Sequence, residues 1–264
     1  MDDVLVTGGT GHLGQDIVGL LKARGDRVRV LARTPGRDPD VEWIQGDLST
    51  GAGVSEAVAG ARTVIHAATL SPAARRGSLR LGDFFRSPPE VDIHGTRRLL
   101  DAATQASVEH FLHVSIVGVQ QSRFPYSRVK AAAEGVVRDS AVPWSIVPAT
   151  GFYWLLARML DTMARRRIWP LPSNLEMQPG DSADFAAYLV ECVAEGPGRD
   201  RTGFGGPETL TLVELARQYQ AARGIAGRIV GLRLPGFALR AGGPQTVPDG
   251  RHGKTTWAEW LARQ

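Results

Sequence analysis

Cysteine is almost absent from this sequence. The one cysteine among 264 residues, Cys192, excludes an intramolecular disulfide and any metal site built from several cysteines. It lies in AAYLVECVAE, which has the spacing of one apolar helix face, so we expect a buried and inert thiol. His66, His94 and His113 lie in or beside predicted core elements. No cluster of His, Asp or Glu has metal-ligand spacing, so no metal is expected.

Long apolar runs are also absent. The longest uncharged stretch, 140–157, is interrupted by two prolines and a glycine, which makes it a poor candidate for a membrane span. The opening MDDVLVTGG is typical of a strand and a turn, and it lacks the basic and apolar regions of a secretory signal. We therefore expect a cytoplasmic protein with no membrane partner.

Lysine is scarce although the chain is basic. The net charge of +4 and the isoelectric point of about 9.6 raise nucleic acid as a partner. Only three of the 31 basic residues are lysines, and the arginines are scattered over separate segments without interleaved aromatic residues. This pattern argues against a nucleic-acid interface. We expect a small-molecule substrate as the partner and leave the oligomeric state open.

Short apolar runs alternate with helical patterns through the first 150 residues, which is typical of βαβ units and a parallel sheet. Strands are predicted at 4–8, 27–33, 41–47, 63–69, 110–119 and 144–151. Further along, helices are predicted at 151–167, 181–196, 211–224 and 255–264, and a loop at 235–250. The expected fold class is α/β. A Rossmann-type doubly wound parallel sheet occupies 1–150, and a smaller C-terminal substrate lobe, 151–264, interleaves with the sheet and lies over its carboxyl edge.

The stretch VTGGTGHLG carries Gly8, Gly11 and Gly14 at intervals of three residues. A pyrophosphate needs backbone N–H groups brought close with no Cβ in the way, and it gains from the positive end of a helix dipole. The glycines follow a predicted strand and open a predicted helix, which is the context that a dinucleotide-binding motif requires. The missing Gly-Lys-Ser/Thr argues against a nucleoside-triphosphate loop.

The end of the second predicted strand indicates the cofactor. Sites that prefer NAD place an acid there, which holds the ribose 2′-hydroxyl. This chain has Ala32 and Arg33 instead, with Arg37 shortly after. Because an arginine offers charge-assisted hydrogen bonds to a 2′-phosphate, we expect NADP(H) rather than NAD(H).

Several stretches together resemble the atypical, NmrA-like branch of the short-chain dehydrogenases/reductases, an NAD(P)H-binding family. They are TGGTGHLG (7–14), GDL (46–48), HAAT (66–69), VDIHGTRRLL (91–100), HVSIVGV (113–119), YSRVKAAAE (126–134) and GGPETLTLVELAR (205–217). The resemblance implies a Rossmann fold and a cofactor site made by Gly8, Thr10, Gly11, His12, Leu13, Gly14, Arg33, Asp47, Leu48, Ala67, Ala68 and Lys130. By the same resemblance, Asp47 and Leu48 are expected to flank the adenine of the cofactor.

Two positions depart from the relatives that the sequence resembles. Asp92 stands where the extended enzymes usually have asparagine, and Pro148 stands where relatives often carry arginine. The first departure puts a proton relay through asparagine in doubt, and the second makes the substrate lobe hard to infer by analogy. Many NmrA-like proteins also lack the catalytic tyrosine and act as nucleotide sensors, whereas YSRVK keeps a Tyr-x-x-x-Lys pattern here.

Tyr126 and Lys130 are the expected catalytic pair. Ketone reduction needs a hydride for the carbonyl carbon and a proton for the oxygen, which Tyr126 can supply. A free phenol has a pKa near ~10, and a cation about 4 Å away contributes about 4 kcal/mol, or roughly three pKa units, at an effective dielectric constant of ~20. Lys130 shares the helix face of Tyr126. Ser115, at the end of the fifth predicted strand, is expected to hydrogen-bond the carbonyl oxygen.

The leading hypothesis is an NADPH-dependent oxidoreductase that reduces a ketone, quinone or related carbonyl of a small substrate, such as an aromatic compound or secondary metabolite. The alternatives are a non-catalytic NADP(H) sensor, and an isomerase or dehydratase that retains its nucleotide. Simpler interpretations stay open for single features. Tyr126 and Lys130 can be a surface pair, and Ser115 a turn residue. The segment 71–90 is either a lid or a surface insertion, and GFYW (151–154) either lines a pocket or fills the core.

Overall fold

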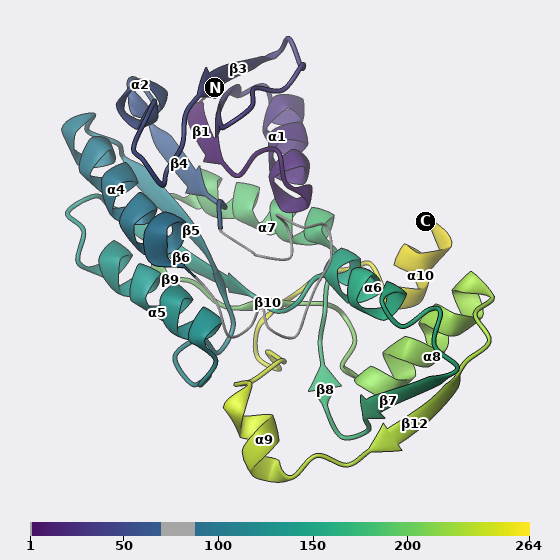
Figure 1. Cartoon of the computed structure of the whole chain (residues 1–264). Coiled ribbons are helices and arrows are strands. Elements are labelled where there is room, and N and C mark those ends of the chain that lie inside the picture. Colours follow the sequence, from purple (N-terminus) through teal and green to yellow (C-terminus); the bar gives the residue numbers. More distant parts are fainter. Residues whose placement is uncertain (1, 70–87) are drawn as a thin grey trace.

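A computed structural model describes residues 2–69 and 88–264, and a nine-stranded parallel sheet forms its centre (Figure 1). The strands are β1 (Asp3–Thr7), β2 (Arg27–Ala32), β3 (Val41–Gln45), β4 (Thr63–His66), β5 (His110–Ile116), β6 (Trp144–Ala149), β9 (Arg199–Asp200), β10 (Phe204–Gly205) and β13 (Arg251–His252). Their order is β13-β10-β6-β5-β4-β1-β2-β3, with β9 paired to β6. The order reverses between β1 and β4, the switch point where such sheets bind ligands.

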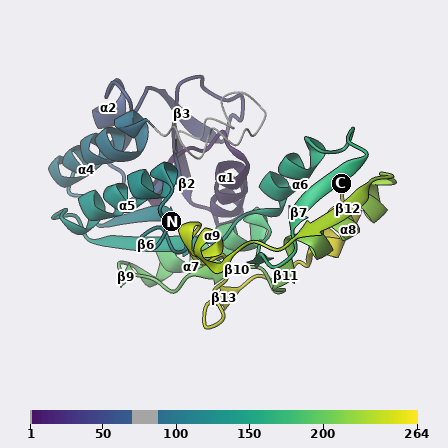
Figure 2. The same ribbon diagram turned by 60° about the horizontal axis from the view of Figure 1, so that its bottom comes forward.

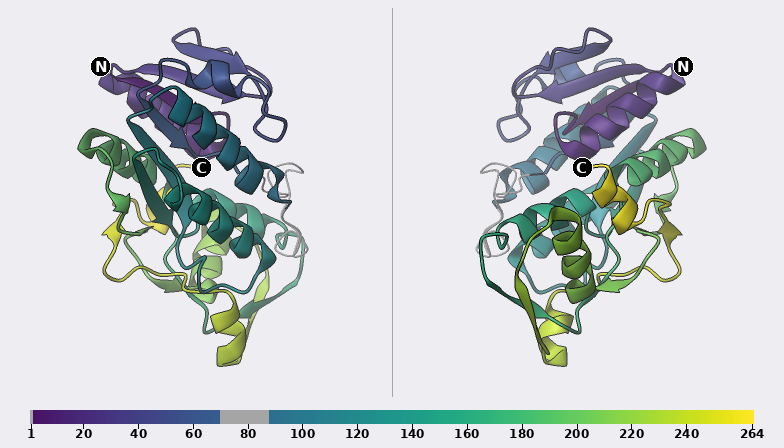
Figure 3. Two further views of the ribbon diagram at one scale, coloured as in Figure 1. Left: turned by 90° about the vertical axis from the view of Figure 1, so that its left-hand side faces the viewer. Right: turned by 90° about the vertical axis from the view of Figure 1, so that its right-hand side faces the viewer.

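Helices cover both faces of the sheet, and Figure 3 shows the two layers from opposite sides. The helices α1 (His12–Arg24) and α7 (Ser182–Glu195) pack on one face. The other face carries α2 (Val54–Val58), α4 (Thr96–Gln105) and α5 (Pro125–Arg138). Strands β1, β4 and β5 are therefore buried on both sides, which explains why their sequences are apolar runs rather than alternating patterns.

A smaller lobe lies beyond the carboxyl ends of the central strands (Figures 1 and 2). Its helices are α6 (Tyr153–Asp161), α8 (Leu212–Arg223), α9 (Gly236–Ala241) and α10 (Trp257–Ala262). Two small sheets complete it, the parallel pair β7 (Ile168–Pro172) and β12 (Arg228–Leu232) and the antiparallel pair β8 (Glu176–Met177) and β11 (Leu210–Thr211). The core of this lobe is aromatic, with Tyr153, Trp169, Tyr219 and Trp257 buried together.

The predicted fold class is confirmed, because the sheet is parallel and doubly wound. The strand predictions match β1 to β6 with ends shifted by up to three residues. The helix predicted at 211–224 is α8, and a capping box of Thr211 and Glu214 begins it. The division at residue 150 stays a prediction. Segments beyond that residue supply α7, β9, β10 and β13 to the main sheet and its core.

The sequence did not predict strands β9, β10 and β13 of the main sheet, the two small sheets, helix α9 inside the expected 235–250 loop, or a π-helical turn, η2 (Glu90–Gly95), before α4. Most of the segment 71–90, expected to be either a lid or a surface insertion, lies outside the described residues, which resume at residue 88. Within the described part of the chain, every helix is too short or too polar to cross a bilayer. Cys192 is buried, and this burial raises the pKa of its thiol.

Candidate active site

The glycine loop is a turn that tolerates no side chain at its two tightest points. Gly8 has a φ of +78°, and a Cβ there would lie 2.8 Å from the carbonyl carbon of Ala67 and from the nitrogen of Ala68. A Cβ on Gly14 would lie 2.1 Å from the carbonyl oxygen of Gly8. The loop therefore brings the ends of β1 and β4 together at the start of α1, as a dinucleotide site needs.

The N-terminus of α1 is open to an anion. Its N-cap residue is Gly11, no side chain caps the helix, and its first turn contains no acid. The first backbone N–H groups and the helix dipole therefore face outward without a side-chain acceptor. Thr10 and Gly11 are exposed, and Leu13 packs against the core. The loop fits the pyrophosphate of a dinucleotide.

Arg33 lies directly after β2 and is exposed. Hydrogen bonds from Ser49 lower the pKa of Asp47, and the charge of Arg33 adds to this shift. Asp47 and Arg33 therefore border the same edge of the sheet. Leu48 packs into the core, so its expected contact with adenine stays a prediction.

A cavity of about 450 Å³ lies between the glycine loop and the segment after β2. Thr10, Arg37 and Trp43 are among the residues that line it. Arg37 follows the second predicted strand, but it was not among the residues predicted for the cofactor site. The structure places Arg37 in the lining of this cavity, together with Thr10 of the glycine loop.

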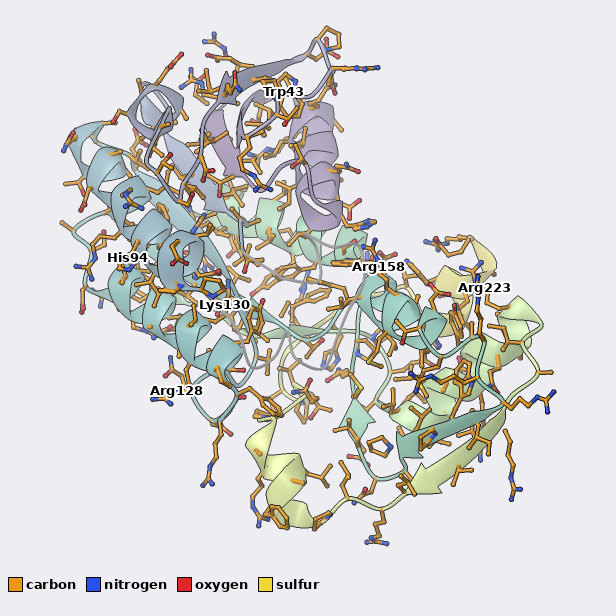
Figure 4. All side chains as sticks on the ribbon, in the orientation of Figure 1. Trp43, His94, Arg128, Lys130, Arg158 and Arg223 are labelled. Carbon is orange, nitrogen blue, oxygen red and sulfur yellow. The ribbon has the colours of Figure 1, made fainter. Side chains whose placement is uncertain are left out.

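The predicted catalytic pair lies beside a buried carboxylate. The ammonium of Lys130 is 3.3 Å from Oδ1 of Asp92, and both side chains are buried, with exposed fractions of 5% and 1%. Thr69 donates a hydrogen bond to the same carboxylate oxygen at 2.7 Å. Figure 4 shows Lys130 on the side of α5 toward the centre of the molecule, whereas Arg128 points outward. The π-helical turn η2 supplies Asp92, and sequence periodicity gave no signal for this contact.

The pKa of Tyr126 is raised rather than lowered, contrary to the expectation from the Tyr-x-x-x-Lys spacing. Burial is the largest cause of the rise. The charge of Lys130 and a hydrogen bond with Thr69 lower the pKa, but the charge of Asp92 raises it. Burial lowers the pKa of Lys130, but Asp92 and Tyr126 outweigh that effect and leave it raised. Tyr126 is therefore a neutral phenol and Lys130 an ammonium at neutral pH.

Ser115 contacts a helix residue. Its hydroxyl donates to Oε1 of Glu134 at 2.5 Å, and Gln120 and Arg138 also donate to that carboxylate. A hydroxyl has one proton, and here Glu134 accepts it. The expected donation from Ser115 to a substrate carbonyl therefore requires this bond to break, and the catalytic role of Ser115 stays a prediction.

His66 links the end of β1 to the turn that carries Asp92. Thr96 donates its hydroxyl proton to the carbonyl oxygen of Asp92 at 2.6 Å, so its oxygen accepts from Nε2 of His66 at 2.8 Å. The unprotonated Nδ1 then accepts from Thr7 at 2.7 Å. Burial, with a contribution from the charge of Lys130, lowers the pKa of His66 to about 3. The ring is a neutral structural connector.

The remaining candidates divide between the site and the core. The His12 ring stacks on Trp154 of α6, which brings part of the GFYW stretch to the phosphate loop. Phe152 packs instead against the core beneath α1 and α7, and Tyr153 belongs to the core of the smaller lobe. The other two histidines proposed for packing lie apart, His113 buried in β5 and His94 exposed. No group of potential metal ligands occurs among residues 2–69 and 88–264.

Two proteins with similar sequences are named as reductases. A chloroplastic divinyl chlorophyllide a 8-vinyl-reductase from Oryza sativa is 31% identical over 234 residues, which cover 80% of this chain and 56% of that protein. The (4-alkanoyl-5-oxo-2,5-dihydrofuran-3-yl)methyl phosphate reductase of Streptomyces griseus is 28% identical over 257 residues, or 93% of this chain and 83% of that protein. This chain thus spans little more than half of the rice protein.

A solved structure supports the fold. MoeE5 in complex with UDP-glucuronic acid and NAD matches with a TM-score of 0.75 over 99% of this chain and 97% of that one. The two sequences are 20% identical, so this likeness shows the architecture alone.

The sequence model of the NAD(P)H-binding family matches residues 8–195, from the glycine loop to the end of α7. The resemblance that the motifs predicted is confirmed, and this chain belongs to the NAD(P)H-binding family.

Proposed function

We propose that this protein is an NADPH-dependent reductase of a small carbonyl compound, with Tyr126 as the proton donor. The observation that carries the proposal is the grouping of a half-buried Tyr126 with the buried Lys130 and Asp92. Asp92 is bonded to Thr69, just after β4, and β4 pairs with β1, the strand that leads into the glycine loop. The names of the two relatives described above, each of which is a reductase, support it.

The described residues suit NADPH. The N–H groups of the glycine loop would bind the pyrophosphate, Arg33 would pair with the 2′-phosphate, and Lys130 would donate to the nicotinamide ribose, as the family resemblance implies. Bound NADPH supplies a hydride to an electrophilic carbon. The protein's own contribution is to orient the two reactants and to supply a proton.

Tyr126 donates that proton. At neutral pH its phenol is protonated, so it can hydrogen-bond a carbonyl oxygen in the ground state and transfer the proton as negative charge develops. Lys130 lies near the phenol, and its charge stabilises the tyrosinate that is left behind. Solvent then returns the proton to Tyr126.

The substrate is proposed to be a carbonyl compound or one with a carbon–carbon double bond conjugated to a carbonyl. The substrate named for the Streptomyces relative carries alkanoyl and oxo groups, and the rice relative is named for reduction of a vinyl group. In either case the added electrons end on an oxygen or on a carbon next to a carbonyl, and a proton completes the reaction.

The proposal is tested with purified protein, NADPH and a panel of aromatic ketones, quinones and alkanoyl lactones. Loss of NADPH absorbance measures turnover, and product analysis separates carbonyl reduction from double-bond reduction. Tyr126→Phe is expected to lower kcat by about 100-fold or more with NADPH binding retained. Tyr188→Phe is the matched control, since Tyr188 lies on α7 and donates to the carbonyl of Thr202. Unchanged kcat in Tyr126→Phe would rule out the tyrosine mechanism.

Two other outcomes point to the alternative functions. NADPH binding without turnover on any substrate indicates a nucleotide sensor. Nucleotide that survives purification and is regenerated in each cycle indicates an isomerase or dehydratase.

A further inference from the structure

We propose that Asp92 is a positioning residue that neutralises Lys130 and thereby keeps Tyr126 protonated, which adapts the site to proton donation and hence to reduction. This inference rests on the proposed function, because it concerns the same tyrosine. It predicts that the site favours reduction over oxidation. It also assigns a role to Asp92, which lies on η2, whereas Tyr126 and Lys130 lie on α5.

The geometry is that of a buried ion pair. The carboxylate of Asp92 lies 3.3 Å from the Lys130 ammonium, and both groups are almost fully removed from solvent. In such surroundings an unpaired charge acts strongly on its neighbours, whereas two opposite charges in contact partly offset each other at a third group. Tyr126 is that third group, because both charges act on it with opposite sign.

The carboxylate is held in place from two directions. Thr69, just after β4, donates to Oδ1 of Asp92 at 2.7 Å. The main-chain carbonyl of Asp92 accepts from Thr96 at 2.6 Å, and Thr96 in turn is bonded to His66. Both contacts limit the movement of Asp92 away from Lys130, so the pairing is a stable property of the site.

The other titratable groups around the pair do not replace Asp92. On α5, Glu134 acts on Lys130 but binds Ser115, Gln120 and Arg138. On β4 and β5, His66 and His113 face Lys130, and burial lowers the pKa of each ring, which keeps both neutral. Among the described residues, the salt bridge of Lys130 is with Asp92.

Removal of the carboxylate charge leaves Lys130 to act on Tyr126 unopposed. A cation favours the tyrosinate form, so the ionisation midpoint of Tyr126 should fall by about one to three pH units in Asp92→Asn. Asparagine keeps the size of the side chain and an oxygen that can accept from Thr69. The variant should also oxidise an alcohol product faster at neutral pH, because a tyrosinate is a proton acceptor.

The experiment is a tyrosinate absorbance titration, which needs neither substrate nor NADPH. The chain has four tyrosines, and burial raises the pKa of Tyr188 and of Tyr219 to about 12 and that of Tyr153 further. In Asp92→Asn an ionisation step should therefore appear well below the others, and it should vanish in Asp92→Asn/Tyr126→Phe. Asp101→Asn, the same change at an exposed position of α4, is the control and should titrate as wild type.

Asp92→Glu, which restores the charge, should return the midpoint toward that of wild type. A titration curve of Asp92→Asn that coincides with wild type overturns the proposal. If Asp92→Asn does not fold, the titration curves of wild type and Tyr126→Phe are compared instead. An ionisation step near neutral pH that is present in wild type and absent from Tyr126→Phe would also overturn the proposal. Failure of the proposed function has a separate signature, namely unchanged turnover in Tyr126→Phe, whatever the titration shows.

Discussion

The rings of His12 and Trp154 stack with their centroids 4.6 Å apart and their planes inclined by 21°. His12 is the first residue of α1, beside the glycine loop, and Trp154 lies in the first turn of α6 in the smaller lobe. The indole nitrogen of Trp154 is buried without a hydrogen-bond partner in the described part of the chain. Ring contact, rather than hydrogen bonding, therefore connects the phosphate loop to the smaller lobe.

A double-mutant cycle should detect this contact. We expect His12→Ala and Trp154→Ala to lower the free energy of unfolding with a coupling of about 0.5–1.5 kcal/mol, the usual value for an aromatic pair. Trp154→Phe should keep most of the coupling because it retains a ring. Denaturant unfolding of the four proteins measures the coupling, and strictly additive effects would show that the stack contributes nothing.

Gly14 and Gly19 form a matched pair on α1. A Cβ on Gly14 would lie 2.1 Å from the Gly8 carbonyl oxygen, whereas nothing lies within 4 Å of the corresponding position on Gly19. Gly14→Ala should abolish NADPH binding because the loop must shift. Gly19→Ala should retain binding and raise the free energy of unfolding by about 0.5–1 kcal/mol. Fluorescence titration with NADPH and denaturant unfolding measure the two effects. Equal affinities in the two variants would contradict the tight fit of the loop.

The elements that could be predicted from sequence are those with a local cause. Glycines at 8, 11 and 14 followed an apolar strand, and Thr211 and Glu214 had capping-box spacing, so β1, α1 and α8 were predictable. The small sheet of β7 and β12 was not. Its first strand, IWPLP, contains two prolines, which disfavour a strand prediction although an edge position tolerates them.

The chemistry of the site depended on contacts between distant residues. Lys130 and Asp92 are 38 positions apart, and Ser115 and Glu134 are 19 apart. Spacing on one helix placed Lys130 beside Tyr126, but it could not show that a carboxylate from another element neutralises the lysine. The expected lowering of the pKa of Tyr126 was wrong in sign, mainly because the phenol is removed from water, and the charge of Asp92 adds to that rise.

His66 should make the protein less stable in mild acid. The pKa of His66 is about 3 in the folded protein, against an ordinary value of 6.5. Between these two pH values the unfolded chain therefore binds one proton more at His66 than the folded protein does. The free energy of unfolding therefore falls by about 1.4 kcal/mol for each unit that the pH drops below 6.5. Other buried histidines, such as His110 with a pKa of about 4, act in the same direction.

Substitution isolates the share of His66 in this pH dependence. His66→Gln can still bond Thr7 and Thr96 but does not titrate, so its stability should vary less steeply between pH 6.5 and 5. Denaturant unfolding at several pH values measures the slope. His252→Gln, at an exposed position, should keep the wild-type slope. A wild-type slope in His66→Gln would show that His66 is not buried in the neutral form.

Arg33 should determine the preference for NADPH. A charge-assisted hydrogen bond contributes about 1.5–3 kcal/mol, so Arg33→Ala should raise the Kd for NADPH by about 10- to 100-fold and leave that for NADH nearly unchanged. Arg27→Ala is the control, since Arg27 begins the same strand and pairs with Asp3. Parallel fluorescence titrations provide the four constants. An equal loss for both nucleotides would assign the role to another cation, such as Arg37 in the adjoining cavity.

Ser115→Ala distinguishes a structural hydroxyl from a catalytic one. Its 2.5 Å bond to Glu134 is buried, so its loss leaves a carboxylate with one donor fewer and should cost about 1–3 kcal/mol of unfolding free energy. Turnover by the folded variant should stay within about threefold of wild type, because the hydroxyl proton is already committed to Glu134. Ser55→Ala, on the exposed side of α2, should change neither quantity. The opposite result, intact stability with kcat reduced by about 100-fold, would mean that Ser115 turns to the substrate during the reaction.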